Sequence, residues 1–268
     1  MTLGIVGEGA LADWIYDAAA TEATAVLGSA TEVVAADPES VVAVGESALL
    51  ALVREGVEAP VLPVDAGPGY GGVSLDDVAV ASTDRESSAE TDAEPRELEP
   101  VWGALDALLA GEFETGSRTL LGVTVGGERV GSALADVMLV TTEPARISEY
   151  AVESRDERVA RFRADGVVVS TPTGSHGYGR SAGGPLLEPE SGVVGVVPVA
   201  PFAVNVDHWV VSADRPVALT VERDEGAVSL LIDDRTVRRV APDTRVEVVE
   251  DDTIELVAVP ESRPFFER

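Results

Sequence analysis

The sequence predicts a two-domain protein, with an α/β N-terminal domain over residues 1–110 and an all-β C-terminal domain over residues 115–250. Strand and helix patterns alternate through roughly the first hundred residues, which is typical of a parallel sheet covered by helices. From residue 119 onward, short runs rich in Val, Thr and Gly replace this alternation. The chain has 268 residues, which is enough for two domains with cores of their own.

The N-terminal elements follow from short apolar runs and from the periodic patterns behind them. Apolar runs predict three strands, over residues 3–6, 40–44 and 60–64. Helical patterns follow the first two runs, one reaching Ala20 and the other covering residues 49–54. Because short strands alternate with helices, we expect the strands to be parallel.

The polar, acidic stretch over residues 83–100 predicts a solvated loop, and residues 101–110 have the pattern of a helix. Later runs, such as residues 167–169, are short, rich in Val and bounded by turn residues. This pattern indicates β-strands separated by turns. We therefore expect little helix after residue 119.

The charge of the chain is extreme. It has 48 acidic and 19 basic residues, a formal net charge of −29, and every basic residue is Arg. Lys is among the commonest residues of average proteins, so its absence is a compositional signal. In molar salt the Debye length falls to about 3 Å, and the repulsion between such carboxylates is screened. The composition therefore favours a halophilic protein of a salt-filled cytoplasm over one that is merely acidic.

Composition also excludes several classes of partner and site. Nucleic acid is not an expected partner, because the sequence has no basic stripe. The chain has no Cys, so disulfides and thiolate metal sites are excluded. The N-terminus carries Glu8 and Asp13 without a basic region, so we expect no signal peptide. Prolines interrupt the longest apolar stretch, residues 192–204, so no membrane segment is expected.

The stretch from Asp165 onward is the most informative. It reads DGVVVSTPTGSHGYGRSAGGP, so a strand over residues 167–169 leads into a segment of small hydroxyl residues and glycines. Such residues let a backbone approach a ligand closely and expose N–H and O–H donors. On composition alone, a tight turn rich in Ser and Gly is an equally good interpretation.

The order of these residues resembles the signature of the NAD kinase family, in which Thr-Pro-Thr-Gly-Ser-Thr-Ala-Tyr precedes Ser-Ala-Gly-Gly-Pro. The residues that match are Thr171, Pro172, Thr173, Gly174, Ser175, Tyr178, Ser181, Ala182, Gly183, Gly184 and Pro185. Weaker similarity covers most of the chain, including residues 62–72 and the apolar run that ends at Asp233. The resemblance implies a two-domain NAD kinase-like fold, in which residues 251–268 return toward the first domain.

The first departure from the family lies after the second predicted strand. The family has Gly-Gly-Asp-Gly-Thr, whereas this chain has Val44, Gly45, Glu46, Ser47 and Ala48. By resemblance, Gly45, Glu46 and Ser47 would bind the phosphate donor, and Glu46 would be the catalytic base or orienting group. Its carboxylate is one methylene further from the backbone than that of Asp, and a shift near 1 Å can cost on the order of 100-fold in rate.

The second departure replaces the Asn-Glu pair that contacts the dinucleotide in the family. Ala135 and Asp136 stand there, so the amide is lost and a carboxylate is kept. By resemblance, NAD would be bound by residues of this pair and of the signature segment, namely Ala135, Asp136, Asp165, Thr173, His176, Gly177, Tyr178 and Ser181. His176 would hydrogen-bond to or stack on the adenine; a histidine in an exposed turn is an equally good interpretation.

The resemblance implies an enzyme that transfers a phosphoryl group from ATP or polyphosphate to the 2′-hydroxyl of the adenosine ribose of NAD, giving NADP. Mg²⁺ would accompany ATP, and no protein metal site is expected. The family also implies a homo-oligomer, and the salt-adapted composition predicts a cytoplasmic protein. Two alternatives stay open, because function is set by the site rather than by the fold. One is a degenerate paralogue that binds a nucleotide as a sensor or regulatory protein, and the other is a kinase for a different hydroxyl acceptor.

Overall fold

The computed structural model describes residues 1–75, 98–143, 146–203, 206–223 and 226–266. The chain divides into two compact units, one formed by Met1–Gly116 with Ile254–Arg268 and the other by Ser117–Thr253. Most of the acidic segment predicted as a loop, residues 83–100, lies outside the described residues. Of its described residues, Leu98 is the N-cap of a helix and Glu99 and Pro100 are that helix's first residues, so the loop prediction is wrong there. Proline is tolerated in the first turn of a helix, where its missing N–H would have no partner.

The first unit is built on a parallel sheet. Its strands lie in the order β2-β1-β3-β4, and the neighbours β1–β2, β1–β3 and β3–β4 are all parallel. The elements are β1 (Thr2–Val6), α1 (Ala10–Ala19), β2 (Thr24–Gly28), α2 (Ala30–Ala35), β3 (Ser40–Val44), α3 (Glu46–Glu55), β4 (Val61–Val64) and α4 (Glu99–Ala110). The end of strand β16 (Arg245–Ala258) joins this sheet, since Leu256 pairs in parallel with Val61.

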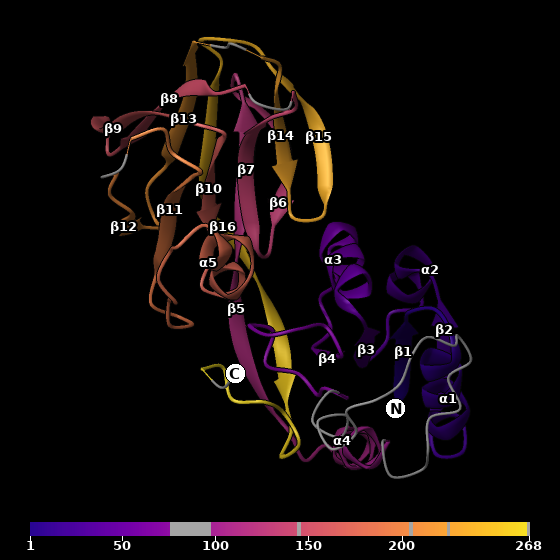
Figure 1. Ribbon diagram of the computed structural model, residues 1–268. Coiled ribbons are helices and arrows are strands. Elements are labelled where there is room, and N and C mark those ends of the chain that lie inside the picture. Colours follow the sequence, from indigo (N-terminus) through magenta and orange to yellow (C-terminus); the bar gives the residue numbers. More distant parts are fainter. Residues whose placement is uncertain (76–97, 144–145, 204–205, 224–225, 267–268) are drawn as a thin grey trace, which may run out of the picture. The chain divides into compact units, whose positions relative to one another are not determined.

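Helices cover both faces of this sheet. Alternate sheet residues such as Leu3, Ile5 and Val42 pack in one core with residues of α1 and α4. On the other face Gly4 is so close to Val33 of α2 that an added Cβ would lie 2.4 Å from it. The helices α1 and α4 therefore lie on one side of the strands, and α2 and α3 lie on the other (Figure 1). Such a two-sided cover explains why the strands are apolar runs rather than alternating patterns.

The prediction of a parallel α/β domain is confirmed. The three predicted strands correspond to β1, β3 and β4, and the helical patterns correspond to α1, α3 and α4. The elements β2 and α2 were not predicted from the sequence. A signal for α2 was present, because Ser29 and Glu32 form a capping box in which each side chain bonds to the other residue's backbone N–H.

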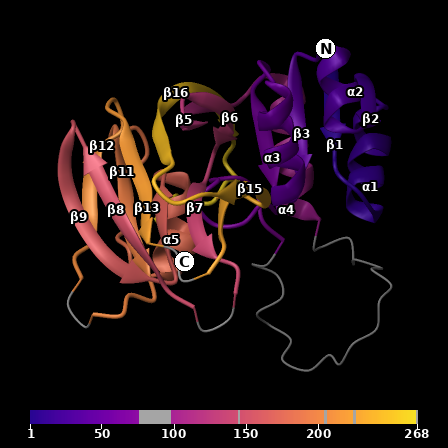
Figure 2. The same cartoon turned by 90° about the horizontal axis from the view of Figure 1, so that it is seen from above.

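The second unit is formed almost entirely by antiparallel strands. They are β5 (Glu114–Val125), β6 (Glu128–Ala133), β7 (Asp136–Thr141), β8 (Ser148–Ser154), β9 (Glu157–Ala164), β10 (Gly166–Ser170), β11 (Val193–Val199), β12 (Trp209–Ser212), β13 (Val217–Arg223), β14 (Val228–Ile232), β15 (Arg235–Val240) and most of β16. One sheet has six strands in the order β12-β11-β10-β7-β14-β15. In the other, β16, β13, β8 and β9 are consecutive neighbours (Figure 2).

The two sheets of this unit share one core. Alternate residues such as Val167 and Val169 of β10 are fully buried in it, together with Tyr150 of β8 and Leu219 of β13. This period of two marks the face of each sheet that packs against the other sheet. The other face of β10 is buried as well, since Val168 packs with Met138 and Val197 in a smaller cluster. The prediction of an all-β second domain is confirmed, apart from a helical turn η2 (Thr173–His176) and a short helix α5 (Tyr178–Ser181). Within the described residues, no helix has the length and apolar character needed to cross a membrane.

Candidate functional site

The first group of predicted site residues lies where β3 ends and α3 begins. Gly45 is the N-cap of α3 and has a φ of 86°, which favours glycine, while Glu46 is the first residue of the helix. The backbone N–H of Gly45 donates to the carbonyl of Val64 at 2.8 Å, so this turn is tied to the end of β4. The side chains of Glu46 and Ser47 are exposed. The first N–H groups of a helix lack acceptors within the helix, so the start of α3 is suited to an anion.

Tyr70 also belongs to this group, although it was not among the predicted site residues. Its hydroxyl donates a hydrogen bond of 2.7 Å to Oε1 of Glu46. The tyrosine ring is only 4% exposed, so the hydroxyl is held by a buried side chain. Tyr70 lies in the glycine-rich segment after β4 that resembles a family loop, and this segment was the available signal.

The second group of residues forms the segment after β10 in the second unit. The Thr171 hydroxyl donates to the carbonyls of Leu134 and Ala135, at 2.6 and 3.1 Å, and accepts from the N–H of Gly174 at 3.1 Å. The Ser175 hydroxyl donates to the Pro172 carbonyl at 2.6 Å and accepts from the N–H of Leu187 at 3.0 Å. These buried hydroxyls hold the segment in shape.

This use of the hydroxyls corrects one expectation. The residue types predict that Ser and Thr of the segment expose donors, but Thr171, Thr173 and Ser175 are all buried. Gly177, Tyr178 and Ser181 are the exposed predicted residues, and the side chain of Tyr178 is 47% exposed. The segment therefore has a buried half that determines its conformation and an exposed half that a ligand can reach.

Gly174 explains why the segment needs glycine at a buried position. A Cβ added there would lie 2.0 Å from the carbonyl oxygen of Ala135, much closer than atoms can approach. The backbone of the signature segment thus packs directly on the Ala135–Asp136 segment. The N–H of Thr171 donates to the same carbonyl at 2.9 Å, and Ser170 pairs with Asp136 across β10 and β7.

Asp233 holds the Ala135–Asp136 segment from its other side. Its Oδ2 accepts from the N–H of Leu134 at 3.0 Å, and its Oδ1 accepts from the N–H groups of Ala135 and Asp136 at 2.8 and 3.0 Å. Burial raises the pKa of the Asp233 carboxyl, and the three N–H donors oppose this rise. Asp136 itself is 7% exposed. Asp233 therefore fixes Ala135 and Asp136, two of the predicted binding residues. The sequence indicated Asp233 only as the end of an apolar strand.

Asp165 and His176 differ from the rest of this group. Asp165 precedes β10, whereas the signature segment follows it, so the strand length of about 16 Å separates them within one chain. The hydroxyl of Tyr150 donates to the Asp165 carbonyl at 3.3 Å. His176 is half-buried; burial lowers its imidazole pKa, and Arg180 lowers it further. A neutral imidazole is suited to hydrogen bonding or stacking.

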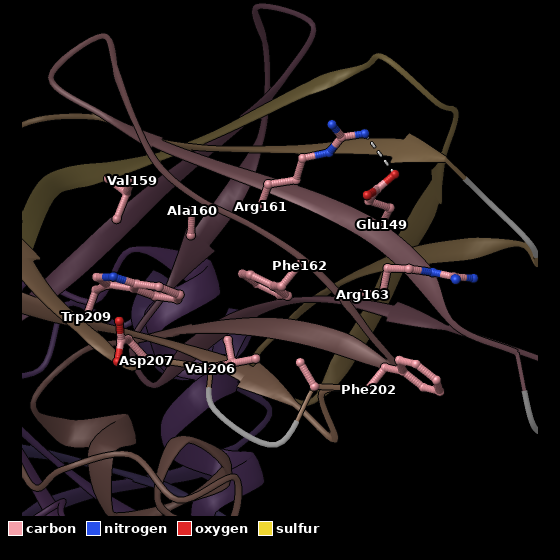
Figure 3. A pocket seen from close by; sticks show the side chains of 11 residues that line it. Glu149, Val159, Ala160, Arg161, Phe162, Arg163, Phe202, Val206, Asp207 and Trp209 are labelled. Atoms are coloured by element: carbon pink, nitrogen blue, oxygen red, sulfur yellow. Dashed lines mark hydrogen bonds and ion pairs between the residues drawn. The ribbon is translucent and has the colours of Figure 1, made fainter.

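The second unit also contains a cavity of about 510 Å³, which no sequence pattern predicted (Figure 3). Phe162 and Trp209 stack in its wall with ring centroids 6.0 Å apart, and Arg161 pairs with Glu149 at 3.0 Å at its edge. Arg163, two residues before Asp165, also lines it. Its wall combines residues of β9 with residues about forty positions later in the chain, namely Phe202, Ala203, Val206, Asp207 and Trp209.

Among the described residues, no group of three or more His, Cys, Asp or Glu side chains is placed to hold a metal ion. A cation that enters with a nucleotide needs no such group, because Mg²⁺ commonly keeps its waters and binds substrate phosphates with one or two carboxylates. Glu46 is the carboxylate at the start of α3 that is available for such a contact.

Comparison with known proteins gives consistent matches. Residues 134–258 match the ATP-NAD kinase C-terminal domain. An NAD kinase of Methanospirillum hungatei is 32% identical over 157 residues, which is 59% of this chain and 56% of that protein. An NAD kinase of Methanothermobacter thermautotrophicus is 41% identical over 114 residues, 42% of this chain and 40% of that protein. The chain thus matches about half the length of these relatives.

Two solved structures resemble the whole chain in fold. An NAD kinase of Archaeoglobus fulgidus in complex with ATP has a TM-score of 0.70 and 22% identity, covering 96% of this chain and 93% of that one. Yeast NADH kinase complexed with NADH has a TM-score of 0.71 and 15% identity, covering 97% of this chain and 84% of that one. These likenesses confirm the predicted two-domain fold.

Proposed function

Since this chain belongs to the NAD kinase family, we propose that it transfers the terminal phosphoryl group of ATP to the 2′-hydroxyl of the adenosine ribose of NAD. The observation that carries the proposal is the signature segment, whose family residues Thr171, Gly174 and Ser175 build a fixed segment with an exposed half. Polyphosphate is the alternative donor. The relatives' names support the NAD substrate, and the solved complexes contain ATP and NADH.

The proposed reaction makes a bond between the ribose 2′-oxygen and the terminal phosphorus and breaks the bond from that phosphorus to ADP. Glu46 accepts the proton of the 2′-hydroxyl or orients this hydroxyl. The N–H groups at the start of α3, with Gly45 and Ser47, receive the donor phosphates. Charge neutralisation of the donor phosphates would come from Mg²⁺ bound together with ATP. Such chemistry depends mainly on positioning and electrostatic stabilisation.

We propose that NAD is bound by the exposed side chains of Tyr178 and Ser181 and by the half-buried His176. The backbone around Gly177 and Ala135 would also contact it. Asp136 and Asp165 are proposed to contact the ribose and nicotinamide ends. The alternatives are a paralogue that binds the nucleotide without turnover and a kinase for another hydroxyl. The relatives are named as kinases, which favours catalysis.

A coupled assay that detects NADPH, with NAD, ATP and Mg²⁺ in molar KCl, tests the proposed reaction. NADPH formation that depends on ATP supports it. Binding of NAD without any turnover favours the paralogue, and ADP release with another acceptor but not with NAD favours the different kinase. Replacing ATP by polyphosphate in the same assay identifies the donor.

The dinucleotide site gives a second measurable expectation. Replacing Tyr178 and Ser181 together by Ala should weaken NAD binding by at least ~1 kcal/mol, because a hydrogen-bonding group and an exposed ring are lost. Calorimetry in high salt measures this change. The Ser191→Ala and Phe266→Ala double variant is the matched control, since both residues are exposed and lie outside the segment. Equal affinity of the Tyr178/Ser181 variant and this control would place the ligand elsewhere.

We also propose that the chain is adapted to a salt-rich cytoplasm, where it would work as a homo-oligomer. The net charge of −29 without Lys supports the first part. Some of the few Arg side chains of the second unit form ion pairs with carboxylates. Examples are Arg158–Glu222 at 3.0 Å and Arg245–Glu153 at 2.6 Å. Light scattering after gel filtration in molar KCl measures the oligomeric state.

Stability should therefore depend on salt. We expect unfolding or loss of activity below roughly 0.5 M KCl, because weaker screening lets the exposed carboxylates repel each other. The measurement is the melting temperature from about 2 M down to about 0.1 M KCl. Glycerol at equal osmolality is the control for effects of water activity. A melting temperature that stays constant over this range would contradict the proposal.

A further inference from the structure

We propose that Tyr70 is a positioning residue that holds the Glu46 carboxylate for the phosphoryl transfer; this inference rests on the proposed function. Its hydroxyl donates to Oε1 of Glu46 at 2.7 Å. That length is typical of a strong bond from a hydroxyl to a carboxylate. Nothing in the local sequence pairs these residues, since they are 24 positions apart.

Tyr70 is held firmly enough to act in this way. Its ring is 4% exposed, and the segment that carries it is closed by backbone bonds at its base. The N–H of Asp65 donates to the Val73 carbonyl at 2.7 Å, and the N–H of Val73 donates to the Pro63 carbonyl at 2.9 Å. A Cβ at Gly72 would lie 2.1 Å from the Pro63 oxygen, so the returning chain packs directly on the end of β4.

Glu46 is the residue that needs such support. The family has Asp at this position, and the Glu side chain has one more rotatable bond and is exposed here. An exposed side chain with that freedom samples several rotamers, and ordering it costs free energy at the moment of reaction. A bond to Oε1 removes much of this freedom beforehand and leaves Oε2 to accept from the substrate hydroxyl. Tyr70 thus compensates for the longer side chain.

The test is a double-mutant cycle between Tyr70→Phe and Glu46→Gln, measured by steady-state kinetics in molar KCl. Tyr70→Phe keeps the buried ring and removes only the hydroxyl. We expect kcat to fall about ten-fold, with KM for NAD and ATP changed less than about two-fold. In the Glu46→Gln background the same change should have almost no effect on kcat, because the base it positions is absent. Tyr16→Phe, a half-buried tyrosine of α1, is the matched control and should leave kcat unchanged.

Several outcomes would overturn the inference. One is an unchanged kcat in Tyr70→Phe, and another is the same ten-fold loss in the Glu46→Gln background. A third is a rise in KM without a change in kcat. Melting temperatures of all variants show whether a loss reflects folding. If the wild type has no turnover, the proposed function fails, and the contact is tested by isotope-labelled tyrosine Cζ resonances. The Tyr70 resonance should then shift in Glu46→Ala, and an unmoved resonance would refute the contact.

Discussion

Replacing Glu46 by Gln should lower turnover at least ~100-fold while changing NAD affinity little. The amide keeps the shape of the side chain and its contact with the Tyr70 hydroxyl, but it cannot accept a proton from the ribose hydroxyl. Glu46 is exposed at the first position of α3, and we propose that the acceptor hydroxyl comes within ~2.6–3.2 Å of it, directly or through one water. Turnover and calorimetric NAD affinity are the two measurements.

Glu55→Gln is the matched control for this substitution. Glu55 is also exposed and ends the same helix, so its change alters the net charge equally without touching the proposed site. A wild type that turns over no faster than Glu46→Gln would defeat the catalytic assignment, whatever the fold. Equal losses in Glu46→Gln and Glu55→Gln would point to a general effect of charge.

The fold could be predicted from the sequence where local patterns and packing agree. Apolar runs identified β1, β3 and β4, because these strands are covered by helices on both faces. The strand β2 was missed, since it lies at the edge of the sheet and its residues are only half-buried or exposed. Because no residue of such an edge strand is fully buried, its sequence needs neither an alternating apolar pattern nor a continuous apolar run.

Only part of the candidate site could be predicted from the sequence. The order of the residues identified the signature segment. Position 174 needs glycine because the backbone there packs directly on Ala135. Residue types alone did not separate the buried hydroxyls of Thr171 and Ser175 from the exposed Ser181. Tyr70 was missed because its partner is far away in sequence, and only the neighbouring ends of β3 and β4 bring them together.

Asp233→Ala should be the most destabilising single substitution that we propose, lowering the free energy of unfolding by about 3 kcal/mol or more. It removes the acceptor of three backbone N–H groups, those of Leu134, Ala135 and Asp136. All three residues are buried, so the freed N–H groups would lack solvent as well as partners. An unsatisfied buried donor costs about 1–3 kcal/mol. Chemical denaturation in molar KCl measures the loss.

Two further variants separate the causes of this loss. Asp233 has a φ of 50°, where Ala is strained, and the exposed Asp243 has a similar φ of 59°. Asp243→Ala therefore measures the backbone cost alone, about 1 kcal/mol. Asp233→Asn keeps one oxygen, which satisfies the N–H groups of Ala135 and Asp136, and turns an NH₂ group toward Leu134. Its loss should fall between the other two. Equal losses in Asp233→Ala and Asp243→Ala would show that backbone strain explains the effect and that the three hydrogen bonds contribute little.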